Sequence, residues 1–212
     1  MAITFYYGSG SPYAWRVWLG LEHKQLAYDL KTVSFSSGDL RKPEFLAINP
    51  RHRVPALVDD GFGLYESAAI LEYLDEKYPG ASLFPGDVWE RAIVRRLVRE
   101  ADEYLAEAMD DLLDEILFKP KEKWQEEHIA RGRQRLADEL AVWETLIRGE
   151  FLAGALSAAD FTLYPMVALT LRCEKKKPDL ALRSLLGPKL TAWMQRVEAL
   201  PCVGKTWPPH WK

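Results

Sequence analysis

The chain has 212 residues, 48% of them hydrophobic and 28% charged, and a formal net charge of −3 at pH 7. That length allows one large domain or two small ones with an adequate core, and the composition is ordinary for a globular protein. The small negative charge argues against nucleic acid or an anionic membrane as a partner, and the apolar runs are too short to span a bilayer. Cys173 and Cys202 are the only cysteines. They cannot form a disulfide framework and, without a secretory signal, they predict a cytoplasmic protein.

The first 80 residues alternate between strand and helix signals. β-Branched and aromatic runs bounded by Gly, Pro, Asp and Ser predict four strands. These are expected at residues 3–7, 27–33, 55–59 and 62–65. Pro12 suits the first turn of a helix after the first strand, Asp60-Gly61 is typical of a hairpin turn, and a helix over 68–78 ends before a Pro-Gly step. The order βαβ-ββα predicts a small four-stranded mixed sheet.

The pattern changes after residue 80. Residues 81–87 contain Pro85 and Gly86 and predict a linker. From residue 88 to 212, apolar side chains recur every three to four residues, as on the buried face of a helix. The sequence therefore predicts two domains: an α/β domain over 1–80 and an all-α domain over 88–212.

Residues 53–73 hold the most informative pattern. A cis Val54-Pro55 bond would turn the backbone N–H and C=O of Val54 toward the peptide group of a ligand. Glu66-Ser67 stands where a helix begins, and the free N–H groups and positive dipole end of a helix bind carboxylates. A backbone segment that can pair with a ligand's peptide group, beside a site that binds a carboxylate, suits a small acidic peptide.

This stretch resembles the glutathione-binding half of the cytosolic glutathione transferases, whose first domain is thioredoxin-like. Two more segments extend the resemblance over essentially the whole chain. Residues 6–17 resemble the family's first strand, catalytic turn and first helix. Residues 152–160 resemble its entry to a buried helix in the second domain, where Ser157 and Asp160 have capping-box spacing. The resemblance implies glutathione as co-substrate, a small hydrophobic electrophile as second substrate, and a homodimer.

The resemblance also implies a side chain that stabilises the glutathione thiolate. Ser11 precedes Pro-Tyr-Ala-Trp-Arg-Val, as in the serine-type classes (theta, tau, phi and zeta), and a hydroxyl there would lower the thiol pKa from its free value of about 8.5. The residues alone equally predict a simple N-cap for the helix. Ser9 in the same loop is a rival, and so are Tyr6 and Tyr7, because tyrosine-type relatives use a phenol near the end of the first strand.

A binding set for the tripeptide follows from the same resemblance. Ser67 would hold the γ-glutamyl carboxylate and Glu66 the ammonium group, although an acidic residue at a helix start is also ordinary capping. Arg53 and His52 would lie near the glycine carboxylate, with Arg53 the better-matched cation. A solvated basic loop is the alternative for this pair. The implied set is His52, Arg53, Val54, Pro55, Glu66 and Ser67.

The electrophile pocket is implied only by its position in the family, between the two domains. Its candidates are aromatic and small side chains, which are more often core residues. They are Tyr13, Tyr104, Ala108 and Trp207. Metal chemistry is not expected, because the four histidines are scattered without ligand spacing.

Three functions fit the sequence. Conjugation of glutathione to an electrophile is the leading interpretation. Glutathione-dependent isomerisation, as in the zeta-class maleylacetoacetate isomerases, is weaker, because the chain lacks that class's Ser-Ser-Cys cluster and has Glu66 where Gln is common. A non-catalytic glutathione-binding module for stress responses is the third. Disulfide reduction is disfavoured, because the first domain has no cysteine.

The implied homodimer has modest support from charge. Four arginines on the helix after the linker could pair with acidic residues of a partner, although a solvated basic face fits them equally well. They are Arg91, Arg95, Arg96 and Arg99.

Overall fold

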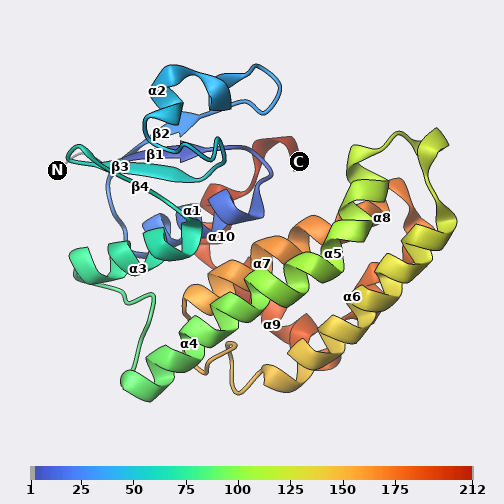
Figure 1. The fold of residues 1–212 in the computed structure, drawn as a ribbon. Helices are drawn as coiled ribbons and strands as arrows, with labels where there is room; N and C mark the ends of the chain where they lie inside the picture. The colour runs from blue at the N-terminus through green and yellow to red at the C-terminus, as the bar shows by residue number, and fades with distance from the viewer. Residues whose placement is uncertain (1–2, 212) are drawn as a thin grey trace. The chain divides into compact units, whose positions relative to one another are not determined.

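The computed structural model describes residues 3–211. Their contacts divide the chain into two compact units. One holds residues up to 85 together with those from 199 onward, and the other holds residues 86–198. Figure 1 shows the strands in the first part and a group of long helices in the second.

The first unit is built on a four-stranded sheet in the order β2-β1-β3-β4. Strand β1 (Ile3–Tyr7) runs parallel to β2 (Tyr28–Thr32) and antiparallel to β3 (Ala56–Asp59), which pairs antiparallel with β4 (Phe62–Tyr65). The predicted hairpin turn is present: Asp60 and Gly61 have φ angles of 49° and 89°, as a two-residue turn with positive φ at both positions requires. The βαβ-ββα order and the mixed thioredoxin-like sheet are confirmed.

Helices α1 (Pro12–His23) and α3 (Ser67–Lys77) pack against each other within this unit. Their approach is close at Gly20, where an added Cβ would lie 2.6 Å from the side chain of Leu71. Lys24, just beyond α1, pairs with Asp75 of α3 at 3.2 Å, and both side chains are buried. Asp75 also accepts from the backbone N–H of Leu83 at 2.7 Å. The ion pair and the backbone hydrogen bond thus connect α1, α3 and the segment that follows α3. A short helix, α2 (Pro43–Leu46), precedes β3.

By its contacts, the C-terminal segment from residue 199 onward groups with the first unit. Helix α10 (Pro201–Thr206) packs on α1. The indole of Trp15 on α1 donates to the hydroxyl of Thr206 at 2.8 Å. Its ring meets the rings of Trp207 and Trp211 edge-on, with centroids 5.5 and 5.3 Å apart. A contact across some 190 residues leaves no local pattern in the chain, so helical periodicity could not reveal it.

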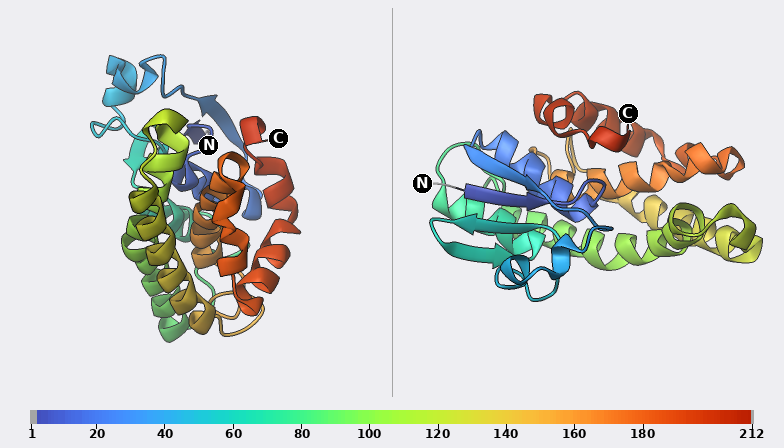
Figure 2. Two further views of the ribbon diagram at one scale, coloured as in Figure 1. Left: turned by 90° about the vertical axis from the view of Figure 1, so that its right-hand side faces the viewer. Right: turned by 90° about the horizontal axis from the view of Figure 1, so that it is seen from above.

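The second unit is helical apart from isolated bridges and turns within its described residues. Its long helices are α4 (Val88–Glu100), α5 (Ala106–Leu112), α6 (Glu126–Leu146), α7 (Ala158–Leu171) and α9 (Pro188–Glu198). A π-helical turn, Ala101–Leu105, joins α4 to α5, another follows at Leu113–Phe118, and the short α8 spans Cys173–Lys176. Every residue of α7 is buried, and α4, α5 and α9 contact it (Figures 1 and 2). None of the helices described is long and apolar enough to cross a membrane.

The predicted capping box begins this buried helix. The N–H of Ser157 donates to the carboxylate of Asp160 at 2.9 Å, and that carboxylate also accepts from Leu152 N–H at 3.0 Å and from the indole of Trp193 at 2.8 Å. Burial raises the pKa of Asp160 to about 6, although these hydrogen bonds oppose the rise. The box therefore joins three segments around one buried carboxyl group.

Candidate active site

Ser11 lies at the turn from β1 into α1. It has extended backbone angles, φ −73° and ψ 120°, and its hydroxyl accepts from the N–H of Ala14 at 3.2 Å, so it is the N-cap of the helix. Pro12 fills the first helical position, where no N–H is needed. A serine hydroxyl accepts and donates at the same time. Capping therefore leaves the hydroxyl proton of Ser11 available to a thiolate at the positive end of the helix.

Ser9 belongs to the tight turn immediately before Ser11. The turn is closed by the N–H of Ser11 donating to the carbonyl of Gly8 at 3.1 Å, and Gly10 takes the positive φ of 89° that such a turn needs. The hydroxyl of Ser9 lies 2.7 Å from Nδ1 of His210. The sequence suggested that residues 207–211 either cover the pocket or pack on the surface, and it gave no specific partner for His210.

The two adjacent tyrosines of β1 have different environments. Tyr6 is half-buried, and its ring meets Phe45 edge-on with a centroid distance of 5.8 Å. Tyr7 is only 2% exposed and packs on Trp18, with ring centroids 4.7 Å apart. Burial raises the pKa of the Tyr7 phenol, and the neighbouring Ser9 hydroxyl partly offsets that rise. Tyr7 is therefore a core side chain.

The loop before β3 carries the expected bend. Its Val54-Pro55 bond is cis, both residues are buried, and His52 and Arg53 beside them are exposed. Asn49 holds the loop and is itself 2% exposed. Its amide donates to the carbonyl of Arg53 at 2.7 Å, and its side-chain oxygen accepts from the N–H of Arg51 at 2.9 Å. The sequence analysis missed Asn49. Its position shortly before Val54-Pro55 was the only feature of the sequence that could have indicated its role.

Helix α3 begins with a strained residue. Glu66 occupies the N-cap position with φ 70° and ψ 105°, and its exposed side chain makes no capping hydrogen bond. A non-glycine residue in such a conformation costs about 1–3 kcal/mol. The N-cap side chain therefore does not satisfy the first N–H groups of α3. In helices that bind anions, these N–H groups bind the anion instead.

Arg16 of α1 is brought to the same helix start. Its guanidinium donates to the hydroxyl of Ser67, and both residues are buried, with 3% and 4% exposure. It also lies over the ring of Tyr13, 5.3 Å from the centroid. The sequence analysis used Arg16 only as a landmark after Ser11. The structure makes it a buried positive charge beside Ser67.

The four electrophile-pocket candidates are divided between the two units. Tyr13 and Trp207 are half-buried in the first unit. In the second unit, Tyr104 lies on the π-helical turn after α4 with 56% of its surface exposed, whereas Ala108 of α5 is 5% exposed.

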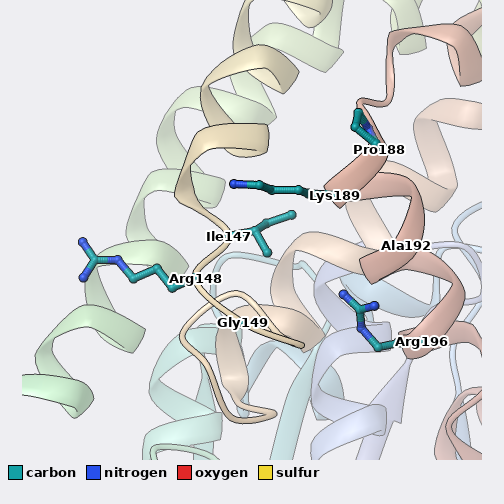
Figure 3. A pocket seen from close by; sticks show the side chains of 7 residues that line it. All are labelled: Ile147, Arg148, Gly149, Pro188, Lys189, Ala192 and Arg196. Carbon is teal, nitrogen blue, oxygen red and sulfur yellow. The ribbon is translucent and has the colours of Figure 1, made fainter.

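A pocket of about 430 Å³ lies within the second unit, at the end of α6 and the start of α9 (Figure 3). It is lined by Ile147, Arg148, Gly149, Pro188, Lys189, Ala192 and Arg196. The side chain of Arg196 points into this space, and its Nε donates to the carbonyl of Glu150 at 2.7 Å. The first N–H groups of α9 are already occupied, because Glu144 accepts from Lys189 and Leu190. None of the predicted site residues lines this pocket.

The cysteines lie outside the candidate site. Cys173 and Cys202 are both buried and unbridged. Burial raises the pKa of the Cys173 thiol to about 12 and also raises that of Cys202. Neither is therefore an activated nucleophile at neutral pH. Across residues 3–211, His, Cys, Asp and Glu side chains form no cluster of three suited to a metal ion.

Comparison with known proteins places this geometry in a family. Residues 10–77 match the glutathione S-transferase N-terminal domain, and residues 126–196 match the glutathione S-transferase C-terminal domain. The chain is 32% identical to glutathione S-transferase A of Pleuronectes platessa over 99% of its own length and 92% of that protein. It is 30% identical to a probable maleylacetoacetate isomerase of Vibrio cholerae, over 99% and 97% of the two lengths.

The fold agrees with a solved structure from the same family. A glutathione transferase of Burkholderia graminis, crystallised with two glutathione molecules bound per subunit, superposes with a TM-score of 0.85 at 26% identity. The superposition covers 97% of this chain and 87% of that one. The chain therefore belongs to the glutathione S-transferase family.

Proposed function

We propose that this glutathione transferase binds glutathione in its first unit and ionises the thiol beside Ser11. The observation that carries the proposal is the position of the Ser11 hydroxyl, which caps α1 at the end of β1 and retains a proton to donate. A hydrogen bond to the charged form of the thiol lowers its pKa, and the helix N-terminus acts in the same direction.

The tripeptide is proposed to lie between the loop before β3 and the start of α3. Ser67 and the first N–H groups of α3 would hold the γ-glutamyl carboxylate, with the buried Arg16 adding positive charge beside them. Glu66 would pair with the γ-glutamyl ammonium group, and its strained backbone supports a functional reason for the residue. Each contact matches one charged group of the ligand.

The other end of the tripeptide is assigned to the cis-proline loop. The backbone of Val54 next to Pro55 would bond the cysteinyl peptide group. The exposed cations Arg53 and His52 would meet the glycine carboxylate. The support for this part is the order of the three groups along the loop and the hydrogen bond from Asn49 that fixes it.

The second substrate is proposed to be a small hydrophobic electrophile. Tyr13, Tyr104, Ala108 and Trp207 are the residues assigned to it. In the reaction, the thiolate sulfur attacks an electrophilic carbon and forms a C–S bond. A leaving group such as halide then departs with its electron pair, so the enzyme supplies neither oxidant nor reductant. Holding the two reactants together and presenting the thiol as thiolate account for the rate.

The test combines binding with turnover. Wild-type protein should be retained on immobilised glutathione and should release halide from a simple aryl halide in the presence of glutathione. Retention without turnover would instead indicate a binding module.

Isomerisation is the second candidate, favoured by the similarity to the Vibrio cholerae protein. In this reaction, the thiolate adds to a conjugated double bond and leaves again after rotation. Conversion of a cis-dienone substrate with catalytic amounts of glutathione, in the absence of aryl halide conjugation, would favour it.

A homodimer in the cytoplasm is also proposed. Val88 and Trp89 at the start of α4 have exposures of 73% and 75%, and exposed apolar residues of this size are typical of interfaces. Arg96 and Arg99 on the same helix make i,i+4 pairs with Glu100 and Glu103, and such pairs are weak at a surface. Light scattering at micromolar concentration should give the mass of two chains. Trp89→Ser should lower it to one.

A further inference from the structure

The last residues of the chain are anchored beside the catalytic turn by an aromatic cluster. Trp211 is only 4% exposed and packs edge-on against Trp15 of α1, which is itself 1% exposed. His210, next to Trp211, is held directly against Gly10, where an added Cβ would lie 2.9 Å from its ring. The buried tryptophan thus fixes the position of an exposed histidine over the loop that carries Ser9.

Two hydrogen bonds of His210 determine which ring nitrogen carries the proton. The indole N–H of Trp211 lies 3.1 Å from Nε2, and an indole can only donate. Nε2 is therefore the acceptor, and in the neutral imidazole the proton is on Nδ1. Nδ1 lies 2.7 Å from the hydroxyl oxygen of Ser9, so His210 donates this bond and Ser9 accepts it.

The direction of that bond decides what Ser9 can do. Because Ser9 is the acceptor toward His210, that bond does not use the hydroxyl proton of Ser9, which can be donated to the neighbouring Tyr7 phenol or to a bound thiolate. Ser9 and Ser11 stand on one tight turn, closed by the bond from Ser11 N–H to the Gly8 carbonyl. The turn therefore carries two serine hydroxyls that each accept a bond from the protein, Ser9 from His210 and Ser11 from the N–H of Ala14.

We propose that His210 is a positioning residue, which holds Ser9 as a second hydrogen-bond donor to the glutathione thiolate. This inference rests on the proposed function, in which the thiol is ionised beside Ser11. In this role His210 acts on the thiolate through Ser9. The C-terminal segment thereby contributes to the chemistry of the first unit through one histidine.

Two substitutions at His210 test its bond to Ser9 and its bond to Trp211 one at a time. In His210→Asn, the amide nitrogen takes the place of Nδ1 and can still donate to Ser9, but the side chain is too short to accept from Trp211. In His210→Gln, the longer amide reaches the place of Nε2 and can accept from Trp211, but it loses the donor at the Nδ1 position. The pKa of bound glutathione is read from thiolate absorbance against pH, alongside kcat and KM for aryl halide conjugation.

His210→Gln is expected to raise the thiol pKa and lower kcat about three- to tenfold, the range for one neutral hydrogen bond, with little change in KM. Ser9→Ala should have an effect at least as large, because it removes the donor to the charged thiolate itself, and the double variant should be no worse than Ser9→Ala alone. His210→Asn should largely restore the wild-type pH profile. Lys205→Gln serves as the control on α10, because the exposed Lys205 forms an ion pair with Glu22, away from His210 and Ser9 in the contacts of the described residues.

Equal effects of the Asn and Gln variants would overturn the proposal, because they would mean that packing rather than the bond to Ser9 matters. A His210→Gln effect that persists in the Ser9→Ala background would also overturn it. Ser11→Ala separates this inference from the proposed function. If only Ser11→Ala raises the thiol pKa, the role of His210 is wrong while the proposed function stands. If wild-type protein neither binds glutathione nor conjugates, the proposed function itself fails.

Discussion

At the residue scale, the side chains to which we assign chemical roles also have roles in folding. Ser11 caps α1, and we propose that it donates its hydroxyl proton to the thiolate. Ser67 begins α3 and is bonded by a buried arginine. Such overlap explains why sequence patterns alone cannot separate a structural from a functional serine. Substitutions that preserve one role and remove the other are needed.

Ser11→Ala should raise the pKa of bound glutathione and lower turnover at neutral pH by roughly one to two orders of magnitude. The reason is the loss of a hydrogen bond to a charged acceptor, about 1.5–3 kcal/mol. Loss of the N-cap should also cost about 1 kcal/mol of stability, measured by urea unfolding. Ser11→Thr keeps the hydroxyl and is the matched control. Full activity in Ser11→Ala, with none in Ser9→Ala, would transfer the catalytic role to Ser9.

Substitutions at Glu66 can separate its backbone strain from its role in binding glutathione. Glu66→Gly should be more stable than Glu66→Ala by about 1–2 kcal/mol, because glycine adopts the positive φ of 70° without the cost that a Cβ imposes. Both variants should raise KM for glutathione, because both lose the carboxylate. Unfolding in urea and initial rates measure the two effects. Equal stability of the two variants would show that the backbone is not strained there.

At the element scale, the buried helix α7 depends on how its first turn is satisfied. Asp160 accepts bonds from a loop, from its own N-cap and from α9, and its pKa is raised to about 6 by burial. A carboxyl group whose pKa is higher in the folded state stabilises the fold while it is protonated, at low pH. This contribution is lost as the pH rises from the unfolded value of about 3.9 through about 6.

Asp160→Asn tests this titration. The variant should be less stable than wild type, because the amide nitrogen cannot accept from Ser157. The stability advantage of the wild type should shrink by about 2–3 kcal/mol between pH 4 and pH 7, because only the wild type loses a buried proton. Urea unfolding of both proteins across this range provides the measurement. An advantage that stayed constant or grew with pH would contradict the raised pKa.

At the scale of the whole molecule, the chain returns to its first unit at its C-terminus. A variant ending at Glu198 should lose at least about 3 kcal/mol of stability, the burial of one or two large aromatic side chains, because Trp15 would lose its cover. It should also bind glutathione more weakly, because Trp15 lies on the helix that Ser11 begins. Urea unfolding followed by circular dichroism and calorimetric binding of glutathione report the two effects. Trp211→Phe, which keeps an aromatic ring, should do much less. Unchanged stability of the truncated protein would mean that α10 and the tail do not support the first unit.

Short-range patterns in the sequence predicted much of the architecture. Alternating residues and a two-residue turn predicted the strands, and spacing of three to four residues predicted the helices, because both signals depend only on neighbours in the chain. The cis bond at Pro55, the capping box at Asp160 and the N-cap at Ser11 were predicted for the same reason. Each is decided within about five residues.

Only the tertiary structure could bring together groups that lie far apart in the sequence. Arg16 meets Ser67 across 51 residues, and Ser9 meets His210 across 201. Such pairs have no periodicity, since any polar residue on the surface of the fold could have been the partner. The sequence by itself therefore determined the elements, the family resemblance and the candidate serines. The packing of α3 and the C-terminal segment on α1 decided which charges and hydroxyls lie beside these serines. Only that packing sets the distances between residues that are remote in the sequence.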